Sequence, residues 1–251
     1  MTISLIQDIL NQTVSAAASQ SISLPMLPQT GDLIVINHVA SATALIQSIS
    51  GFGVLVWSSI LNNHTDMWWG IVGSNPSLSA TLTYQEAAYH DVDCVDFRTT
   101  VGWKSPVMGQ NNTNYASVAT SMLTNSITTT NPSVLIIAAI GAISTGAHPV
   151  TQSNPLNGFT LYDGVSWLYI TGYYESLGTL VITESIPGTY SSGVSFASPI
   201  YAWSIIASFQ EISGGISGDG LTWVSSMTKK HVPKLVPWAR RFPKFMPRTV
   251  I

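Results

Sequence analysis

The chain has 251 residues, of which only 8% are charged, and its formal net charge is −3 at pH 7. A single cysteine, Cys94, excludes an internal disulfide, while the length suffices for one large β-domain or two small ones. The longest apolar run, residues 134–143, is ten residues long, about half of the ~20 that a membrane-spanning helix needs.

The first segment, residues 1–20, is predicted to be a short amphipathic helix or an arm that a neighbour orders. Apolar residues recur at spacings of three and four between Ile3 and Ala17, and Thr2 is a suitable N-cap. The same segment lacks a basic n-region and a continuous apolar h-region, and it carries Asp8, so it does not resemble a signal peptide.

Residues 21–228 are predicted to form a β-domain, because short Val-, Ile-, Thr- and aromatic-rich runs alternate with Gly, Pro and Asn. Residues 78–84 alternate apolar and hydroxyl side chains, as in a strand with one wet face. Residues 32–40 and 133–143 are apolar enough for interior strands, and residues 200–209 have both faces largely apolar. Many short strands without intervening helices favour an all-β fold, an antiparallel β-sandwich of the jelly-roll kind.

A faint internal repeat divides this domain into similar halves, about residues 21–130 and 131–212. Each half begins with a strong apolar strand, followed by a Gly-Phe pair and an aromatic strand. The repeat fits two facing sheets of similar composition.

The C-terminal segment, residues 229–251, is predicted to be an extended arm. It follows the glycine-rich hinge 213–220, and its four prolines exclude a regular helix or a central strand. It holds seven of the nine basic residues and no acid, so the formal charge is near +7 here and near −10 (2 minus 12) in the other 228 residues. This asymmetry predicts an acidic or anionic partner for the arm.

We consider three binding partners for the arm: neighbouring subunits, nucleic acid and anionic lipid. The fourth interpretation is a terminus that binds nothing and is solvated. We expect the contacts to come from its basic and aromatic side chains. They are Lys229, Lys230, Lys234, Trp238, Arg240, Arg241, Phe242, Lys244, Phe245 and Arg248.

The densest group of potential metal ligands is residues 90–96. On a strand, His90, Cys94 and Asp96 would lie on one face and Asp91 and Asp93 on the other. The spacing matches neither a zinc site nor an EF-hand, so we expect no metal, and either a sheet-edge role or another structural role without calcium. The alternative is a hard cation held by Asp91 and Asp93 together with loop carbonyls.

Catalytic signatures are weak. The sequence contains no Gly-x-Ser-x-Gly elbow and no phosphate-binding loop, and its five histidines are scattered. A glycosidase pair among Glu86, Asp163, Glu175 and Glu184 is the alternative. We expect no catalytic residue and no cofactor, and hence a protein that is not an enzyme.

Aromatic clusters at Trp68-Trp69, Trp167 and Tyr173-Tyr174 suit either a carbohydrate platform or a core. Consecutive strand residues point to opposite faces, so we expect one member of each pair in the core and its partner at an oligomer interface. Glycosylation sequons begin at Asn63 and Asn111. A surface with few carboxylates also suits an acidic medium.

The hydroxyl-rich body, the strands at 31–36 and 201–206 and the basic, proline-rich arm resemble jelly-roll virion proteins, in particular capsid and turret proteins of archaeal viruses from hot acidic springs. The resemblance implies a non-enzymatic subunit of a capsid, turret or spike. Such a subunit is assembled in the host cytoplasm and is extracellular in the particle.

Its partners would be further copies of itself and other virion proteins, with lipid or nucleic acid at the arm and a glycan on the host surface. The arm is C-terminal here, whereas many capsid proteins carry theirs at the N-terminus. The alternatives are a cell-surface filament subunit that assembles by strand exchange and a carbohydrate-binding adhesin.

Overall fold

The computed structural model describes residues 3–13, 15–170 and 172–212, all within a compact unit that spans residues 1–213. This part of the chain consists of antiparallel strands and loops and contains no helix, which confirms the predicted all-β class. Accordingly, none of its residues forms a helix that could cross a bilayer. The predicted arm, with every contact residue assigned to it, lies outside the described residues.

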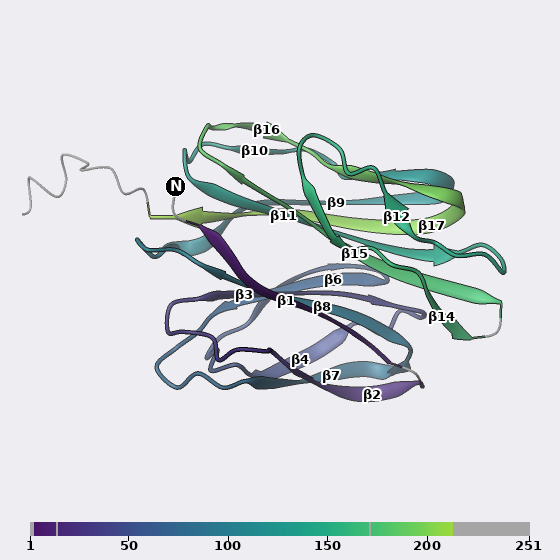
Figure 1. Cartoon of the computed structure of the whole chain (residues 1–251), viewed down its shortest axis with the longest axis horizontal. Coiled ribbons are helices and arrows are strands. Elements are labelled where there is room, and N and C mark those ends of the chain that lie inside the picture. The colour runs from purple at the N-terminus through teal and green to yellow at the C-terminus, as the bar shows by residue number, and fades with distance from the viewer. Residues whose placement is uncertain (1–2, 14, 171, 213–251) are drawn as a thin grey trace, which may run out of the picture. The chain divides into compact units, whose positions relative to one another are not determined.

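Residues 4–98 build two sheets (Figure 1). Inner sheet 1 has the strand order β1-β8-β3-β6-β5, and outer sheet 1 has the order β2-β7-β4. The strands are β1 (Ser4–Gln12), β2 (Ala17–Ser23), β3 (Leu33–Ala40), β4 (Ile46–Gly51), β5 (Ser58–Asn62), β6 (Thr65–Ile71), β7 (Ser79–Ala88) and β8 (His90–Arg98).

Residues 103–211 build the other two sheets. Inner sheet 2 runs β9-β17-β11-β15-β13, with β12 paired to one end of β17 and β14 to one end of β15, and outer sheet 2 is the pair β10-β16. The strands are β9 (Trp103–Leu123), β10 (Ile127–Thr129), β11 (Val134–Ser144), β12 (Gln152–Ser153), β13 (Thr160–Asp163), β14 (Trp167–Ile170), β15 (Tyr173–Glu184), β16 (Gly188–Tyr190) and β17 (Gly193–Glu211).

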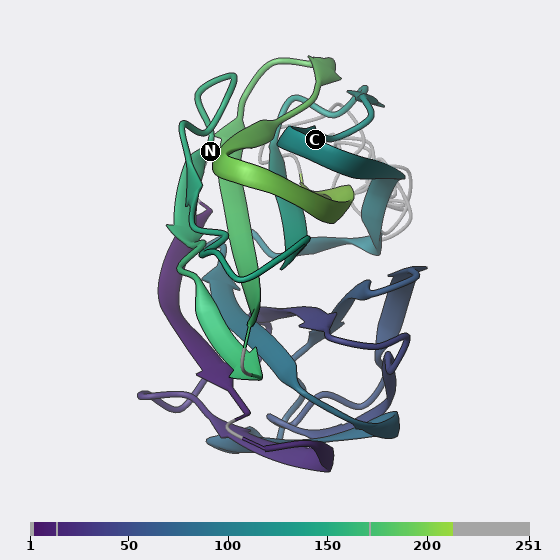
Figure 2. The same ribbon diagram turned by 90° about the vertical axis from the view of Figure 1, so that its right-hand side faces the viewer.

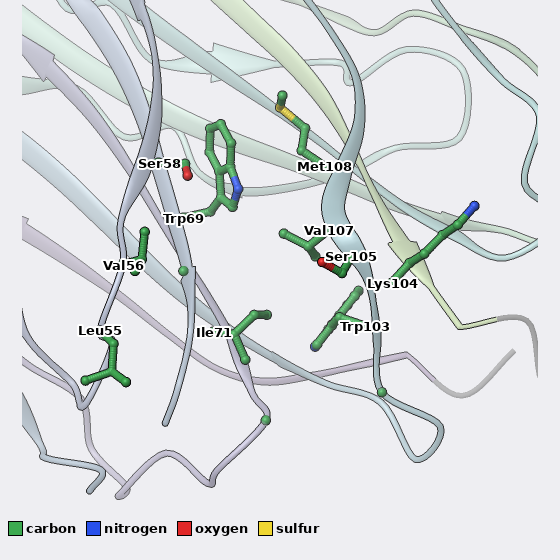
Figure 3. A pocket seen from close by; sticks show the side chains of 13 residues that line it. Leu55, Val56, Ser58, Trp69, Ile71, Trp103, Lys104, Ser105, Val107 and Met108 are labelled. Carbon is green, nitrogen blue, oxygen red and sulfur yellow. The ribbon is translucent and has the colours of Figure 1, made fainter. Parts of the chain in front are cut away.

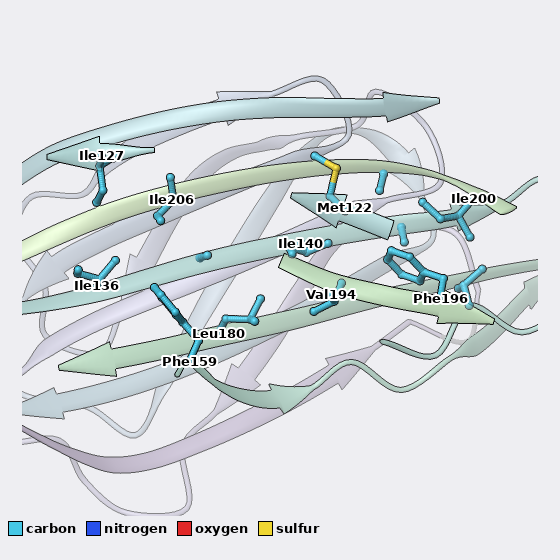
Figure 4. Close-up of a cluster of buried hydrophobic side chains, with 14 of the residues drawn as sticks. Met122, Ile127, Ile136, Ile140, Phe159, Leu180, Val194, Phe196, Ile200 and Ile206 are labelled. Atoms are coloured by element: carbon cyan, nitrogen blue, oxygen red, sulfur yellow. The ribbon is translucent and has the colours of Figure 1, made fainter. Parts of the chain in front are cut away.

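The four sheets stack in layers, with the two inner sheets facing each other (Figures 1 and 2). Alternate residues of β3 illustrate the arrangement: Ile34 and Ile36 pack against outer sheet 1, whereas Leu33 and Val35 pack against inner sheet 2. A third apolar cluster fills the space between inner sheet 2 and outer sheet 2 (Figure 4). Strands β3 and β11 are buried along their whole lengths because other sheets cover both of their faces. Strands in such a position are apolar at most residues.

The inner sheets approach closely where β11 crosses β3 and β6. A Cβ at Gly141 would lie 2.4 Å from Thr65 Oγ1 and 2.6 Å from Val39 Cγ2. The missing side chain of Gly141 therefore lets the two halves of the molecule come into contact.

The predicted N-terminal helix is wrong, because Ser4–Gln12 forms strand β1 and pairs with β8. A β-bulge between Leu5 and Gln7 shifts the alternation by one residue. Leu5 consequently packs towards inner sheet 2 and Ile9 towards outer sheet 1. The resulting apolar spacing mimics that of a helix.

Candidate functional site

A chain of hydrogen bonds joins three buried side chains of inner sheet 1. His38 Nδ1 lies 3.2 Å from Asp66 Oδ1, and His38 Nε2 lies 2.9 Å from His90 Nδ1. At the two ends, His90 Nε2 lies 2.9 Å from the Ala17 carbonyl oxygen, and Asp66 Oδ2 accepts the Ile46 backbone N–H at 2.7 Å. The chain thus ties β3, β6 and β8 to the first residues of β2 and β4.

The Ala17 carbonyl fixes where the protons lie. A carbonyl only accepts, so His90 Nε2 donates to it, and the Nδ1 of neutral His90 is then the acceptor for His38 Nε2. Burial, with a smaller contribution from His38, lowers the pKa of His90 to about 3, so that His90 stays neutral. Both nitrogens of each ring take part in these hydrogen bonds, so the group has a structural role. We call Asp66, His38 and His90 the histidine tie.

Tyr84 covers the tie from outer sheet 1. Its ring stacks on His90 with centroids 3.5 Å apart and an interplanar angle of 9°. Its hydroxyl donates to Gln20 Oε1 at 2.6 Å, so this hydroxyl is committed to a side-chain amide.

A second polar group lies on the opposite face of β8, between the two inner sheets. It comprises Asp91 and Asp93 of β8, Asp163 of β13 and Glu175 of β15. Asp91, Asp93 and Glu175 are 2%, 0% and 1% exposed, and each has a buried carboxylate oxygen without a hydrogen-bond partner. We call these four residues the acidic layer.

Basic side chains are remote from the acidic layer. Within the described ranges the lysines and arginines are Arg98 and Lys104 alone. Arg98 forms a two-pronged pair with Asp32, with both N–O distances 2.8 Å, and Lys104 is exposed on β9. The acidic layer is therefore more stable protonated than ionised.

The pKa values of the acidic layer are raised accordingly. Burial raises the pKa of Asp91 to about 7. Burial and then the charge of Asp163 raise the pKa of Asp93 well above its usual range, and burial followed by the charge of Asp91 does the same for Glu175. Burial also raises the pKa of Asp163. These carboxyls pack as neutral groups in acidic surroundings.

The four glycosidase candidates do not meet in one place. Asp163 and Glu175 belong to the acidic layer, whereas Glu86 is exposed on β7 of outer sheet 1. Glu184 lies at the other end of β15 from Glu175.

The predicted alternation of residues 90–96 is confirmed, since Cys94 packs towards outer sheet 1 and Val95 towards inner sheet 2. Of the two structural roles expected for this segment, the position at a sheet edge is wrong, because β8 lies between β1 and β3. Over the residues that the structure describes, no three His, Cys, Asp or Glu side chains form a group suited to a metal ion.

The aromatic pairs divide between the two faces of their strands, as expected, but the interface position expected for the second member is wrong for Trp68. Trp69 is buried between the inner sheets, while Trp68 packs against the cluster on the opposite face, because inner sheet 1 is covered on both sides. Tyr174 packs on the cluster of inner sheet 2, and Tyr173 is 50% exposed. Trp167 is half-buried.

Both sequon asparagines are exposed. Asn63 lies in the turn between β5 and β6 with a positive φ of 55°, and Asn111 lies on β9. The third residue of the first sequon, Thr65, is fully buried.

An apolar groove of about 770 Å³ opens between the two inner sheets at the edge that β5 and β9 form (Figure 3). One wall comes from the loop before β5 and from β6, and the other from the first residues of β9. The lining side chains include Leu55, Val56, Trp69, Ile71, Trp103, Val107 and Met108. A smaller pocket of about 280 Å³ shares Lys104 with the groove and is bordered by Ile212.

Sequence reasoning missed both the groove and the histidine tie. The walls of the groove come from segments more than 30 residues apart, and His38 and Asp66 are separated by 28 residues. Strand alternation placed His38 on the same face as Ile34 and Ile36, which was the one available signal.

Comparison with known proteins gives no match: no family model, no curated protein and no solved structure is detectably similar to this chain.

Proposed function

We propose that this chain is a structural subunit of a virus particle, a building block of a capsid, turret or spike. It assembles with further copies of itself through its β-sandwich body, and its C-terminal arm, residues 229–251, anchors it. The observation that carries the proposal is a strand order that occurs twice in the chain.

The strand order of the first half supports a jelly roll, with one departure at β5. Eight strands wound as two Greek keys place strand 1 beside 8, 3 beside 6 and 2 beside 7. The sheets of residues 4–98 have the orders β1-β8-β3-β6-β5 and β2-β7-β4, so these three pairings are present. Strand β5 departs from the pattern, because it pairs with β6 and not with β4. Such domains occur in viral capsids and also in lectins.

The second half repeats most of this order. Inner sheet 2 runs β9-β17-β11-β15-β13, and outer sheet 2 pairs β10 with β16. With β14 left out of the count, β9, β17, β11, β15 and β13 take the places of strands 1, 8, 3, 6 and 5, and β10 and β16 take those of 2 and 7. Strand β12, in place 4, departs from the first half because it pairs with β17 of the inner sheet. We therefore propose two jelly rolls with the division between Arg98 and Trp103, in place of halves that meet at residue 130. The apolar strands at 32–37 and 134–137 remain equivalent, as β3 and β11.

Surface composition supports assembly. Charged residues make up 8% of the chain, against about 25% in ordinary soluble domains. Large apolar side chains such as Leu55 and Val56 are exposed beside the edge strand β5. A poorly charged surface with open sheet edges favours association.

The test is to examine the full-length protein by electron microscopy and light scattering, at acidic and neutral pH and over a range of salt. Closed shells or regular arrays are the expected result. Filaments would favour the appendage subunit instead. Monomers under every condition would contradict the proposal, and binding in a glycan screen would then favour the adhesin.

A further inference from the structure

We propose that the groove between β5 and β9 binds the proline-rich arm, residues 229–251, of a neighbouring copy of the chain. This inference rests on the proposed function as a self-assembling subunit and names the surface that receives the arm.

The groove exposes apolar surface that lacks a cover among the described residues. Leu55 and Val56 are 87% and 75% exposed, the largest values for big apolar side chains in the described part of the chain. Ile71 and Val107 line the same groove (Figure 3). Apolar surface gathered in a groove marks a binding site more often than scattered exposed residues do.

Both strands that frame the groove end a sheet. β5 pairs with β6 alone and the first part of β9 with β17 alone among the described strands. An extended segment between them would therefore find backbone donors and acceptors as well as apolar side chains.

Two tryptophans give the groove the chemistry that recognises proline-rich segments. Trp69 and Trp103 line it from opposite walls, and the Trp103 indole N–H is buried without a hydrogen-bond partner. Extended proline-rich chains dock in aromatic-lined grooves because they are already ordered, and their carbonyl groups are free to accept hydrogen bonds.

The arm has matching residues. Prolines recur at positions 233, 237, 243 and 247, and the large apolar residues Trp238, Phe242, Phe245 and Met246 lie between them. Filling the groove with these side chains would remove apolar area of both partners from water.

The length of the connecting segment favours a groove on another copy. The described chain leaves β17 at Ile212, beside the pocket that shares Lys104 with the groove. The 20 residues from Ser213 to Val232 can span up to about 66 Å when extended, so the arm is not confined to the surface of its own chain. A long, glycine-containing connection is also what exchange of segments between copies requires.

Charge favours the same partner. The formal charge of the arm is near +7 and that of the remaining 228 residues is near −10, of which the four carboxyls of the acidic layer are neutral in acidic surroundings. Lys104, the one basic side chain of the groove, points away from the apolar lining (Figure 3), so it does not oppose entry of the arm.

The test is disulfide trapping between two full-length variants. One carries Leu55→Cys in the groove. The other carries a single cysteine at one apolar position of the arm, tested in turn as Trp238→Cys, Phe242→Cys, Phe245→Cys and Met246→Cys. The native Cys94 is fully buried and gives the same background throughout. The matched control replaces Leu55→Cys with Ile186→Cys, an apolar residue that is 67% exposed in the turn between β15 and β16.

After mixing and mild oxidation, we expect the heterodisulfide with Leu55→Cys to exceed that with Ile186→Cys by about tenfold for at least one arm position, since docking raises the effective concentration. Equal yields at all four positions would overturn the proposal. A third variant carries both Leu55→Cys and the arm cysteine in one chain. A disulfide that forms only within this double variant, and not between the two single variants, would also overturn the proposal.

Electron microscopy of the same mixtures separates this proposal from the proposed function. Particles without preferential trapping at Leu55→Cys would contradict the groove and leave the structural role standing. Preferential trapping without particles would support the groove and contradict the role in a particle.

Discussion

His38 Nε2 donates to His90 Nδ1 across 2.9 Å, and this contact joins two neighbouring strands of inner sheet 1 inside a fully buried polar chain. The contact is directional because His90 donates its other N–H to the Ala17 carbonyl. A buried group of this kind stabilises the fold only while every member keeps its partner.

His90→Ala should therefore lower the free energy of unfolding by about 3 kcal/mol, because it leaves the His38 N–H and the Ala17 carbonyl buried without partners. Urea denaturation at neutral pH measures the loss. Tyr84→Phe is the matched variant, since it keeps the ring stacked on His90 and removes only the hydroxyl bond to Gln20, which we expect to cost about 1 kcal/mol. A loss from His90→Ala no larger than that from Tyr84→Phe would contradict this role, because Tyr84→Phe leaves the chain of hydrogen bonds through His90 intact.

Stability should fall as pH rises through the acid range. The pKa of Asp91 is raised from its ordinary 3.8 to about 7, and that of Asp96 to about 6. A raised carboxyl pKa means that the folded state binds more protons, so this stability is complete below about pH 3.8 and is lost towards pH 7. His90 opposes the trend: its pKa is lowered from 6.5 to about 3, so its contribution is complete above pH 6.5 and is lost as pH falls towards 3.

Several carboxyls with raised pKa values stabilise the fold at low pH, whereas His90 alone contributes in the opposite direction. The melting temperature should therefore be higher at mildly acidic than at neutral pH. Each kcal/mol of unfolding free energy changes the melting temperature by about 2–4 °C in a domain of this size. Asp91→Asn should reduce the pH dependence, whereas Glu86→Gln, on the exposed face of β7, should leave it unchanged. Calorimetry across this pH range checks both. A melting temperature that rises from acid to neutral pH would contradict the role of the acidic layer.

Gly141→Ala should destabilise the contact between the two halves. The new Cβ would lie 2.4 Å from Thr65 Oγ1, so that β11 must move away from inner sheet 1, at a cost of about 1–3 kcal/mol. Gly146→Ala is the control, because its Cβ would meet nothing closer than 3.9 Å. Thermal unfolding of both variants gives the comparison, and equal stability would mean that the inner sheets can separate without loss.

Leu55→Asp should weaken assembly without unfolding the chain. The side chain is 87% exposed, so a charge here affects folding by no more than about 0.5 kcal/mol, but it would be buried once the groove is filled. Ile186→Asp introduces the same charge at a comparably exposed position. Light scattering should show lost association for Leu55→Asp alone, and loss in both variants would point to a general effect of charge.

Much of the strand content could be predicted from residue patterns. Ala80, Leu82 and Tyr84 are buried and Thr81 and Thr83 exposed, as the alternation along β7 predicts. The unbroken apolar run of β11 correctly indicated an interior strand. The N-terminal strand was misread because the bulge after Leu5 breaks the two-residue period on which strand prediction depends.

The groove and the acidic layer could not be predicted in this way. Alternation along β8 separates Asp91 and Asp93 from His90 and Cys94, but it does not tell which face meets water. Inner sheet 2 covers the aspartates, and its Glu175 lies 84 positions after Asp91 in the chain. Trp69 and Trp103 likewise meet in one groove because two sheet edges coincide.

The sequence by itself determined the β class, the two faces of each regular strand and the separation of an acidic body from a basic arm, since these depend on local periodicity and charge. Only the tertiary structure decided that both faces of the inner sheets are buried and that carboxyls lie between them. Burial depends on which sheets stack, and that is settled by contacts between residues far apart in the chain, such as Gly141 with Val39.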